Sequence, residues 1–374
     1  MGSPVLTRAR RKDVADRAAQ GQPPHLPLPR RRRTKSGMSA DAPILIYCRW
    51  EAAGGIERVS LRLRDFLRRN GVAAELVSRE GHPVFGAEVR RLVETDLAGR
   101  TLIFSRMRDL LHIGWRGLGA RLVYWRHVPL IGSLTKRVVD AAFIVSMSWR
   151  APVLCVCDEL AEHLARLPLL RRAALAVAYA PVAPDVPATM PIRRTDQPKH
   201  LLYVGRPGAQ KRLDKVLAVV AEARDAGHPV RLRVHGYPPP QDEPDGVTFA
   251  PLGSDPQASF SEADALIVWS EYEGFPTIMV EAARAGLPII ANAFATGLRD
   301  FERRIGPTAR IEDRPEALMG AFTRLPRGSY DLSGVRDEAL WSVWAKVLGV
   351  SMRDICSKSD ISSRESAGLR TSDV

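Results

Sequence analysis

Two glutamates in the second half of the chain, Glu273 and Glu281, flank the start of a helix predicted at residues 276–285. Helical side chains lean toward the N-terminus, so Glu281 can reach a ligand held there and accept hydrogen bonds from hydroxyls such as those of a ribose. Glu273 precedes the helix and is placed to accept from the hydroxyls of a second sugar. The pair suits a nucleotide-sugar, and a solvated helix with two unrelated glutamates is the plain alternative.

The start of the same helix has the features of a diphosphate site. Gly274 permits a tight turn and a close approach to a ligand, and Phe275 and Pro276 follow it. Proline suits the first helical position because its missing N–H would be unpaired there. The free N–H groups of Thr277 and Ile278 can then bind an anion such as a diphosphate.

A second motif, at residues 205–211, follows a strand predicted at 200–204. Gly205 ends the strand, and the loop presents Arg206 and Lys211. Two cations at the carboxyl edge of a sheet can hold a diphosphate and neutralise a leaving group, although a solvated loop with two surface cations is the alternative. The motif is neither a Walker loop nor a Gly-x-Gly-x-x-Gly fingerprint, so ATPase and dinucleotide-binding functions gain no support.

These motifs require secondary structure that brings them to one edge of a sheet. Short apolar runs predict strands, and apolar residues at helical spacing predict helices between them. Such alternation is typical of a parallel sheet covered on both faces. In the first half, strands are predicted at 43–48, 74–78, 101–105, 122–125, 142–146 and 153–156, with a helix at 56–70. In the second half, strands are predicted at 200–204, 230–234, 263–269 and 288–291, with helices at 212–226, 276–285 and 337–348.

The chain therefore divides into two doubly wound, Rossmann-like α/β domains that face a central cleft. A Pro-rich stretch at 181–198 has the composition of a linker between them. The predicted parts are a disordered basic tail at 1–40, a first domain at 41–190, a second domain at 191–335, a helix at 336–352 that can cross back to the first domain, and a disordered tail at 353–374.

The net charge of +13 is concentrated toward the start of the chain. Residues 1–40 carry +8 and residues 41–190 carry +6, which leaves −1 for residues 191–374. The basic tail suits a nucleic-acid arm or attraction to anionic lipid, or it is an unstructured extension; a folded protein that starts at Met38 is a further alternative. The charge of the first domain suits an anionic membrane surface or a phosphorylated acceptor, and an Arg-rich composition without such a role is the alternative.

Several classes of protein are disfavoured by composition. No apolar run approaches the ~20 residues of a membrane-spanning helix, and no apolar segment follows the first basic residues as in a secretory signal. The four cysteines form neither a metal-binding spacing nor a disulfide framework. We therefore expect a cytoplasmic protein, with peripheral attachment at the inner face of the plasma membrane as a further hypothesis.

Together, the two motifs resemble the donor domain of retaining glycosyltransferases of the GT-B fold, family 4 (glycosyl transferases group 1). That family carries Gly-Arg and then Lys after the first strand of this domain, as Gly205, Arg206 and Lys211 do here. It also carries two Glu separated by seven residues, which Glu273 and Glu281 match. The other matching positions of this motif are Gly274, Phe275, Pro276, Ala282, Gly286 and Pro288.

The resemblance implies roles for these residues. Arg206 and Lys211 would hold the diphosphate of the donor, Glu281 the ribose, and Glu273 with the backbone at 274–276 the donor sugar. The family keeps the anomeric configuration of a hexose-type sugar and needs no metal. No Asp-x-Asp motif occurs here, so no metal or other cofactor is expected, and the nucleotide-sugar is a co-substrate. The base is expected to lie near the backbone at 236–240 and 251–253.

The first domain resembles the family less closely. Gly54 and Gly55, followed by a helix, resemble its glycine-rich first loop, which faces the donor phosphates and the acceptor. His127, after the strand predicted at 122–125, lies where relatives often carry a histidine near the sugar, and a purely structural histidine is the alternative. The family suggests a glycan or lipid-linked acceptor in envelope or exopolysaccharide assembly.

Other functions stay open at this point. A GT-B epimerase would turn over its donor without an acceptor, and a phosphorylase would need a cofactor-holding lysine that nothing marks. A non-catalytic scaffold would bind the nucleotide-sugar without transfer. A nucleic-acid binder depends on the basic tail alone, and its steeply salt-dependent binding would be lost on deletion of residues 1–37.

Overall fold

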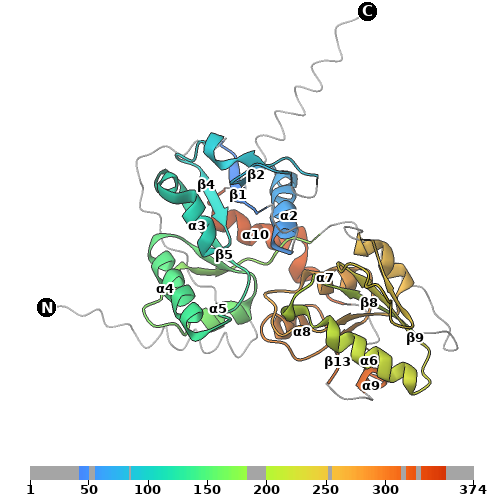
Figure 1. Cartoon of the computed structure of the whole chain (residues 1–374). Helices are drawn as coiled ribbons and strands as arrows, with labels where there is room; N and C mark the ends of the chain where they lie inside the picture. Colours follow the sequence, from blue (N-terminus) through green and yellow to red (C-terminus); the bar gives the residue numbers. More distant parts are fainter. Residues whose placement is uncertain are drawn as a thin grey trace, which may run out of the picture.

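The computed structural model consists of two α/β domains, and the C-terminal helix lies against the first of them (Figure 1). It describes residues 42–49, 55–83, 86–182, 199–251, 255–312, 317–325 and 330–350. The predicted tails at 1–40 and 353–374 and nearly all of the Pro-rich stretch lie outside the described residues.

The first domain is built on a seven-stranded sheet in which every strand pairing is parallel. Its central strands are short, apolar and fully buried, as in a sheet that is covered on both faces. In spatial order the strands are β3 (Arg90–Arg91), β2 (Ala74–Ser78), β1 (Ile44–Tyr47), β4 (Thr101–Phe104), β5 (Arg121–Arg126), β6 (Val153–Cys155) and β7 (Leu175–Val177). The helices are α2 (Gly55–Arg69), α3 (Met107–Ile113), α4 (Leu134–Arg150) and α5 (Asp158–Leu164), with short 3₁₀ segments η1 (Leu92–Glu94), η2 (Gly114–Gly119) and η3 (Arg172–Ala174).

The second domain has a six-stranded sheet, again with parallel pairings throughout. Its strands are, in spatial order, β10 (Val247–Phe249), β9 (Val230–His235), β8 (Lys199–Val204), β11 (Ala265–Val268), β12 (Ile289–Ala291) and β13 (Ala309–Arg310). The helices are α6 (Leu213–Asp225), α7 (Thr277–Arg284), α8 (Leu298–Arg304) and α9 (Ala317–Thr323), with 3₁₀ segments η4 (Ala209–Lys211), η5 (Pro256–Glu262) and η6 (Ser333–Val335). The C-terminal helix α10 (Asp337–Leu348) follows this domain in sequence. The two parallel sheets confirm the predicted doubly wound α/β class.

One predicted strand is wrong. Residues 142–146 belong to α4, a helix of 17 residues, rather than to a strand. A short apolar run looks the same in a buried strand and on the buried face of a helix. Here Ser133 caps the helix by accepting a hydrogen bond from the backbone N–H of Lys136. Ile144 and Met147, three residues apart, are then buried on the same side of the helix.

The C-terminal helix α10 connects the two domains. It follows the second domain in sequence but packs on the first (Figure 1), where the indole rings of Trp344 and Trp125 meet edge to face with centroids 4.9 Å apart. The guanidinium of Arg121 donates to the carbonyl oxygens of Val347 and Leu348 at 2.6 and 2.7 Å, which satisfies orphan acceptors at the helix end. The helix thereby fixes the first domain to the second.

No helix within the described residues is long and apolar enough to cross a membrane.

Candidate active site

A largely buried ion pair of the second domain joins the two motifs found in the sequence. Nζ of Lys211 lies 2.6 Å from Oε1 of Glu273, and the hydroxyl of Ser270 donates to the same oxygen at 2.6 Å. Glu273 is only 7% exposed, and a buried carboxylate is costly unless it is paired and hydrogen-bonded. Lys211 is therefore held beside the loop that leads from β11 into α7.

Backbone contacts hold the same two loops together. The N–H of Glu271 donates to the carbonyl of Gln210 at 2.9 Å, and the side-chain amide of Gln210 donates to the carbonyl of Tyr272 at 2.8 Å. The hydroxyl of Tyr203, on β8, donates to the carbonyl of Lys211 at 2.7 Å. Segments about 60 residues apart in sequence thus form one rigid site at the carboxyl edge of the sheet.

A glycine of the loop after β9 touches this site. Gly236 has a φ of +88°, and a Cβ there would lie 2.1 Å from the carbonyl oxygen of Gly205, so only glycine fits. This loop begins the segment 236–240, near which the base of the donor is expected. Of the second segment expected there, residues 252 and 253 lie outside the described residues.

Helix α7 begins at Thr277, one residue later than predicted, and Pro276 is its N-cap residue rather than its first helical residue. The N–H of Met279 donates to the carbonyl of Pro276 at 3.0 Å. The N–H groups of Thr277 and Ile278 donate to no other described residue. They are available to an anion that approaches the start of the helix, where its dipole also favours negative charge.

Glu281, in the middle of α7, is paired across the domains. Its side chain is 3% exposed, and Oε1 accepts from Nη1 of Arg62, on α2, at 2.6 Å. Oε2 is buried and has no partner among the described residues. A buried acceptor without a partner is costly, so this oxygen is suited to a ligand hydroxyl. The Glu281 carboxylate can therefore accept from Arg62 through Oε1 and from a ribose hydroxyl through Oε2 at the same time.

The first domain covers one side of Gly274. A Cβ at Gly274 would lie 1.6 Å from the carbonyl oxygen of His127. On another side, a Cβ at Gly297 would lie 2.4 Å from the carbonyl oxygen of Gly274, and the thiol of Cys157 donates to that oxygen at 3.1 Å. Position 274 requires glycine because the backbone of His127 leaves no space for a Cβ there. This requirement is stricter than that of the tight turn inferred from the sequence, since a side chain of any size would overlap His127.

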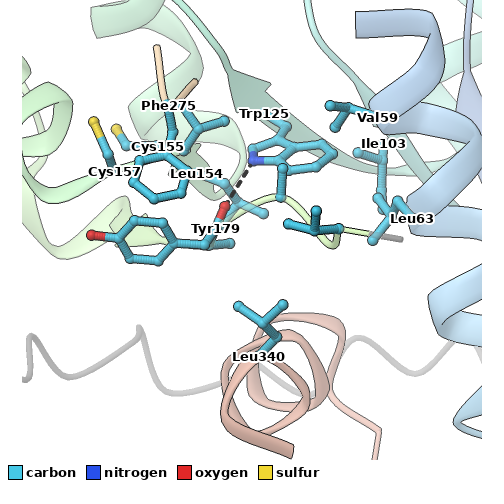
Figure 2. Packing of buried hydrophobic residues seen from close by; sticks show 14 of the residues in the cluster. Val59, Leu63, Ile103, Trp125, Leu154, Cys155, Cys157, Tyr179, Phe275 and Leu340 are labelled. Atoms are coloured by element: carbon cyan, nitrogen blue, oxygen red, sulfur yellow. Dashed lines mark hydrogen bonds between the residues drawn. The ribbon is translucent and has the colours of Figure 1, made fainter. Parts of the chain in front are cut away.

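Phe275 anchors this contact in the core. Its ring meets the ring of Tyr179, from the first domain, edge to face at 4.7 Å between centroids, as Figure 2 shows. The guanidinium of Arg304, on α8, lies 4.9 Å from the centroid of the same Tyr179 ring, and the Tyr179 hydroxyl donates to Asp158 at 3.1 Å. Apolar and polar contacts therefore both join the domains beside the site.

His127 lies directly after β5, and its imidazole packs 4.3 Å from the indole of Trp125 between ring centroids. Nε2 is buried without a partner among the described residues. Burial lowers the pKa of His127 to about 3, and the charges of Arg106 and Arg126 contribute to this lowering. The imidazole is therefore neutral at physiological pH and can act there as a neutral hydrogen-bonding group rather than as an acid.

This lowered pKa predicts a pH dependence of stability. In the unfolded chain, His127 has its ordinary pKa of 6.5 and is protonated below that pH. In the folded chain it stays neutral until the pH falls to about 3. The free energy of unfolding therefore falls as the pH drops below 6.5, by about 2 kcal/mol at pH 5 from this group alone. His127→Gln is expected to show a smaller loss between about pH 7 and pH 5 in urea denaturation.

The control for this measurement is His228→Gln, which replaces an exposed histidine of the second domain and is expected to keep the full loss. An identical loss in the chain with His127 and in the His127→Gln variant would contradict the assignment of a neutral buried imidazole.

Of the remaining candidate residues, Arg206 and Gly55 have no contact among the described residues that fixes them in the site. Arg206 is exposed and makes no ion pair with the residues that the structure describes. Gly55 is the exposed first residue of α2, with no atom near the position of a Cβ. Gly54 lies outside the described residues. The structure thus brings Lys211 and Glu273 together and leaves Arg206 at the rim.

Two residues of the site were not found in the sequence. Ser270 stands three residues before Glu273, and its position at the end of β11 was a usable signal. Arg62 is one of several arginines on α2, and nothing in its surroundings predicts a partner 219 residues away.

Among the described residues, no group of three or more His, Cys, Asp and Glu side chains gathers in a way that could hold a metal ion.

Part of the second domain matches a known protein family. Residues 198–326, which cover most of the second domain, match the family model described as glycosyl transferases group 1. No curated protein matches the sequence. The matched segment contains both motifs and the whole of α7.

Solved glycosyltransferase structures share the fold over nearly their whole length. A glycosyltransferase from Rickettsia africae superposes with a TM-score of 0.58 at 13% identity, over 89% of this chain and 100% of that one. The apo form of the lipopolysaccharide outer core galactosyltransferase WaaB gives 0.57 at 16%, over 82% and 98%. HepE from Anabaena, in complex with UDP and glucose, gives 0.56 at 15%, over 87% and 99%. The chain therefore has the GT-B fold, and the fold and the family match together support a GT-B glycosyltransferase.

Proposed function

We propose that this protein is a retaining glycosyltransferase of family 4 that moves a hexose-type sugar from a nucleotide-sugar to a hydroxyl acceptor without a metal ion. The observation that carries the proposal is the arrangement around α7: a lysine–glutamate pair before the helix, free N–H groups at its start, and a buried glutamate within it. The acceptor is proposed to be a glycan or lipid-linked glycan of the cell envelope or an exopolysaccharide, glycosylated on the cytoplasmic side.

The donor is proposed to bind along the carboxyl edge of the second sheet. Its diphosphate would lie between Lys211 and the N–H groups of Thr277 and Ile278, with Arg206 closing over it from the rim. Its ribose would donate to Oε2 of Glu281, which has no partner among the described residues. These contacts supply charge and hydrogen bonds where a diphosphate and a diol need them.

The reaction then follows from leaving-group stabilisation. The bond between the anomeric carbon and the diphosphate oxygen breaks, and the acceptor oxygen bonds to the same carbon from the same face. The acceptor proton passes to the departing diphosphate. Preorganised cations and N–H groups favour this step because negative charge grows on the diphosphate in the transition state.

Donor entry is proposed to involve a separation of the two domains beside Gly274. The side of Gly274 that faces His127 has no space for a further atom, since even one added carbon would overlap the carbonyl oxygen of His127. Opening there would admit the sugar, and closure would exclude water before transfer.

Replacement of Arg206 and replacement of Lys211 are expected to have similar effects on transfer but different effects on stability. Arg206→Met should lower transfer about 100-fold and leave the melting temperature unchanged, because Arg206 is exposed and pairs with no described residue. Lys211→Met should lower transfer by a similar factor and also lower the melting temperature, because it leaves the buried Glu273 carboxylate without its cation. Both are measured by transfer of a labelled sugar and by thermal unfolding of the same preparations.

The same assay tests the other parts of the proposal. EDTA is expected to leave transfer unchanged, and the anomeric proton coupling of the product is expected to match that of the donor. Release of a second nucleotide-sugar instead of a glycoside would favour an epimerase. Full transfer activity in Lys211→Met would contradict the proposed site.

A further inference from the structure

Exposed large hydrophobic side chains gather on one part of the molecule. Among the described residues, all nine of them lie in the first domain, and eight lie between residues 111 and 169. Leu118, Leu169 and Trp115 are 88%, 82% and 81% exposed. Apolar side chains that gather on a surface mark an interaction site. The nine are Val93, Leu111, Trp115, Leu118, Leu134, Val138, Val139, Trp149 and Leu169.

These side chains come from segments that the fold places together. Helix α3 with η2 follows β4, and α4 follows β5, its neighbour in the sheet. Figure 1 shows α3 and α4 on the same side of the first domain, away from the second domain. The indole N–H of Trp149, near the end of α4, donates to the carbonyl of Leu169 at 3.0 Å. We name residues 107–119, 134–150 and 165–172 the α3–α4 face.

The same face is strongly basic. Its three segments hold eight Lys or Arg and two Asp, a net charge of +6. Neither aspartate offsets this charge at the surface, because Asp109 is buried and accepts from the N–H groups of Ser105 and Arg106, and Asp140 pairs with Arg126 at 3.3 Å. The bases are Arg108, Arg116, Lys136, Arg137, Arg150, Arg166, Arg171 and Arg172.

Apolar and basic residues alternate closely along the face. At the start of α4, Leu134 is followed by Lys136 and Arg137 and then by Val138 and Val139, all of them exposed. Long basic side chains extend past apolar neighbours to reach polar groups. Tryptophan is favoured where an apolar layer meets water. Trp115 belongs to η2 and Trp149 to the last turn of α4, and both are exposed.

We propose that the α3–α4 face docks on the surface of an anionic lipid bilayer. Exposed Lys and Arg beside Trp, Leu and Val are typical of elements that lie in the headgroup region, with apolar tips inserted and bases near lipid phosphates. The core of a protein–protein interface is instead depleted of charged residues, whereas Lys136 and Arg137 stand between the exposed apolar side chains at the start of α4. No described helix spans a membrane, so this attachment is peripheral. The inference does not depend on the proposed transfer reaction.

The test is sedimentation of the full chain with vesicles of equal parts phosphatidylcholine and phosphatidylglycerol, compared with phosphatidylcholine alone. Binding is expected to the anionic vesicles. Trp115→Ser with Trp149→Ser should weaken it at least about ten-fold, because binding scales with inserted apolar area. Arg137→Ser with Arg150→Ser should weaken it about five-fold for each charge removed.

A control pair of substitutions tests whether binding depends on the bases of the α3–α4 face or on positive charge anywhere in the chain. Arg231→Ser with Arg336→Ser removes two exposed bases outside the face and is expected to leave binding within about two-fold of the unsubstituted chain, because attraction to the bilayer falls off within a Debye length. Circular dichroism and melting temperature of each variant verify that it is folded, since all four arginines and both tryptophans are exposed.

Three results would overturn the inference. The first is anionic binding that survives the tryptophan pair but is lost when Arg30 to Arg33 are replaced by Ser, which would assign it to the basic tail. The second is a dimer in sedimentation velocity that the tryptophan pair dissociates, which would make the face a contact between copies. The third is equal binding to the two kinds of vesicle.

Discussion

Gly274→Ala is expected to lower the free energy of unfolding by about 3 kcal/mol and to reduce sugar transfer at least about 100-fold. The added methyl would lie 1.6 Å from the carbonyl oxygen of His127 and 2.8 Å from its carbonyl carbon. These are backbone atoms of the other domain, so no side-chain rotation can make room. The contact between the domains must shift, and with it every group that faces the donor. Urea denaturation and a transfer assay measure the two effects.

Gly334→Ala is the matched control, because the Cβ position at Gly334 has no atom within 4 Å and its φ is not positive. That variant is expected to keep the stability and the activity of the unsubstituted chain. If Gly274→Ala behaved like this control, the close contact between His127 and Gly274 would not exist in solution.

The second large effect is expected at the ion pair between Arg62 and Glu281. Arg62→Gln should cost about 3 kcal/mol of stability, because it leaves a carboxylate that is 3% exposed without its cation. Glu281→Gln should cost less, since the side chain of Arg62 is 12% exposed and can turn toward water. The double variant should cost less than the two single variants together, with a coupling of about 2 kcal/mol. Urea denaturation of the four proteins measures it.

The chain offers a matched pair for comparison. Arg69, also on α2, lies 2.9 Å from Asp337 of α10, with side chains that are 40% and 31% exposed. The cycle of Arg69→Gln and Asp337→Asn is expected to give a coupling below about 1 kcal/mol, because exposed pairs are screened by water. Equal couplings for the two pairs would contradict the buried position of Glu281.

Much of the second domain follows from local sequence. The strand–loop–helix around Glu273 is marked by a buried apolar run, then Gly and Pro, then apolar residues at helical spacing, and each signal acts over a few residues. The boundaries of α7 and α10 were therefore predicted to within one residue. The strand predicted at 142–146 failed because its apolar residues suit a helix equally well, and the cap at Ser133 was not recognised.

The contacts between the domains could not be predicted in the same way. Arg62 meets Glu281, and His127 meets Gly274, only because the two domains are held together by α10 and by packing such as that of Phe275 on Tyr179 (Figure 2). No local pattern carries this information. The exposure of Trp115 could not be predicted either, since an isolated tryptophan in a sequence is usually buried.

The central claim is that α7 and the two loops before it bind a nucleotide-sugar. It is tested most directly by thermal unfolding of the full chain with UDP-, GDP-, ADP- and dTDP-sugars, together with Glu281→Gln and the control Glu271→Gln. Glu271 carries the same charge but is 53% exposed and pairs with Arg212, so its replacement is expected to leave donor binding unchanged.

We expect one donor, at about 100 times its dissociation constant, to stabilise the chain and the Glu271→Gln control by roughly 2.7 kcal/mol. Glu281→Gln should lose most of that shift, because a hydrogen bond to a charged group contributes about 1.5 to 3 kcal/mol. A panel in which no donor raises the melting temperature, or in which Glu281→Gln keeps the full shift, would contradict the account.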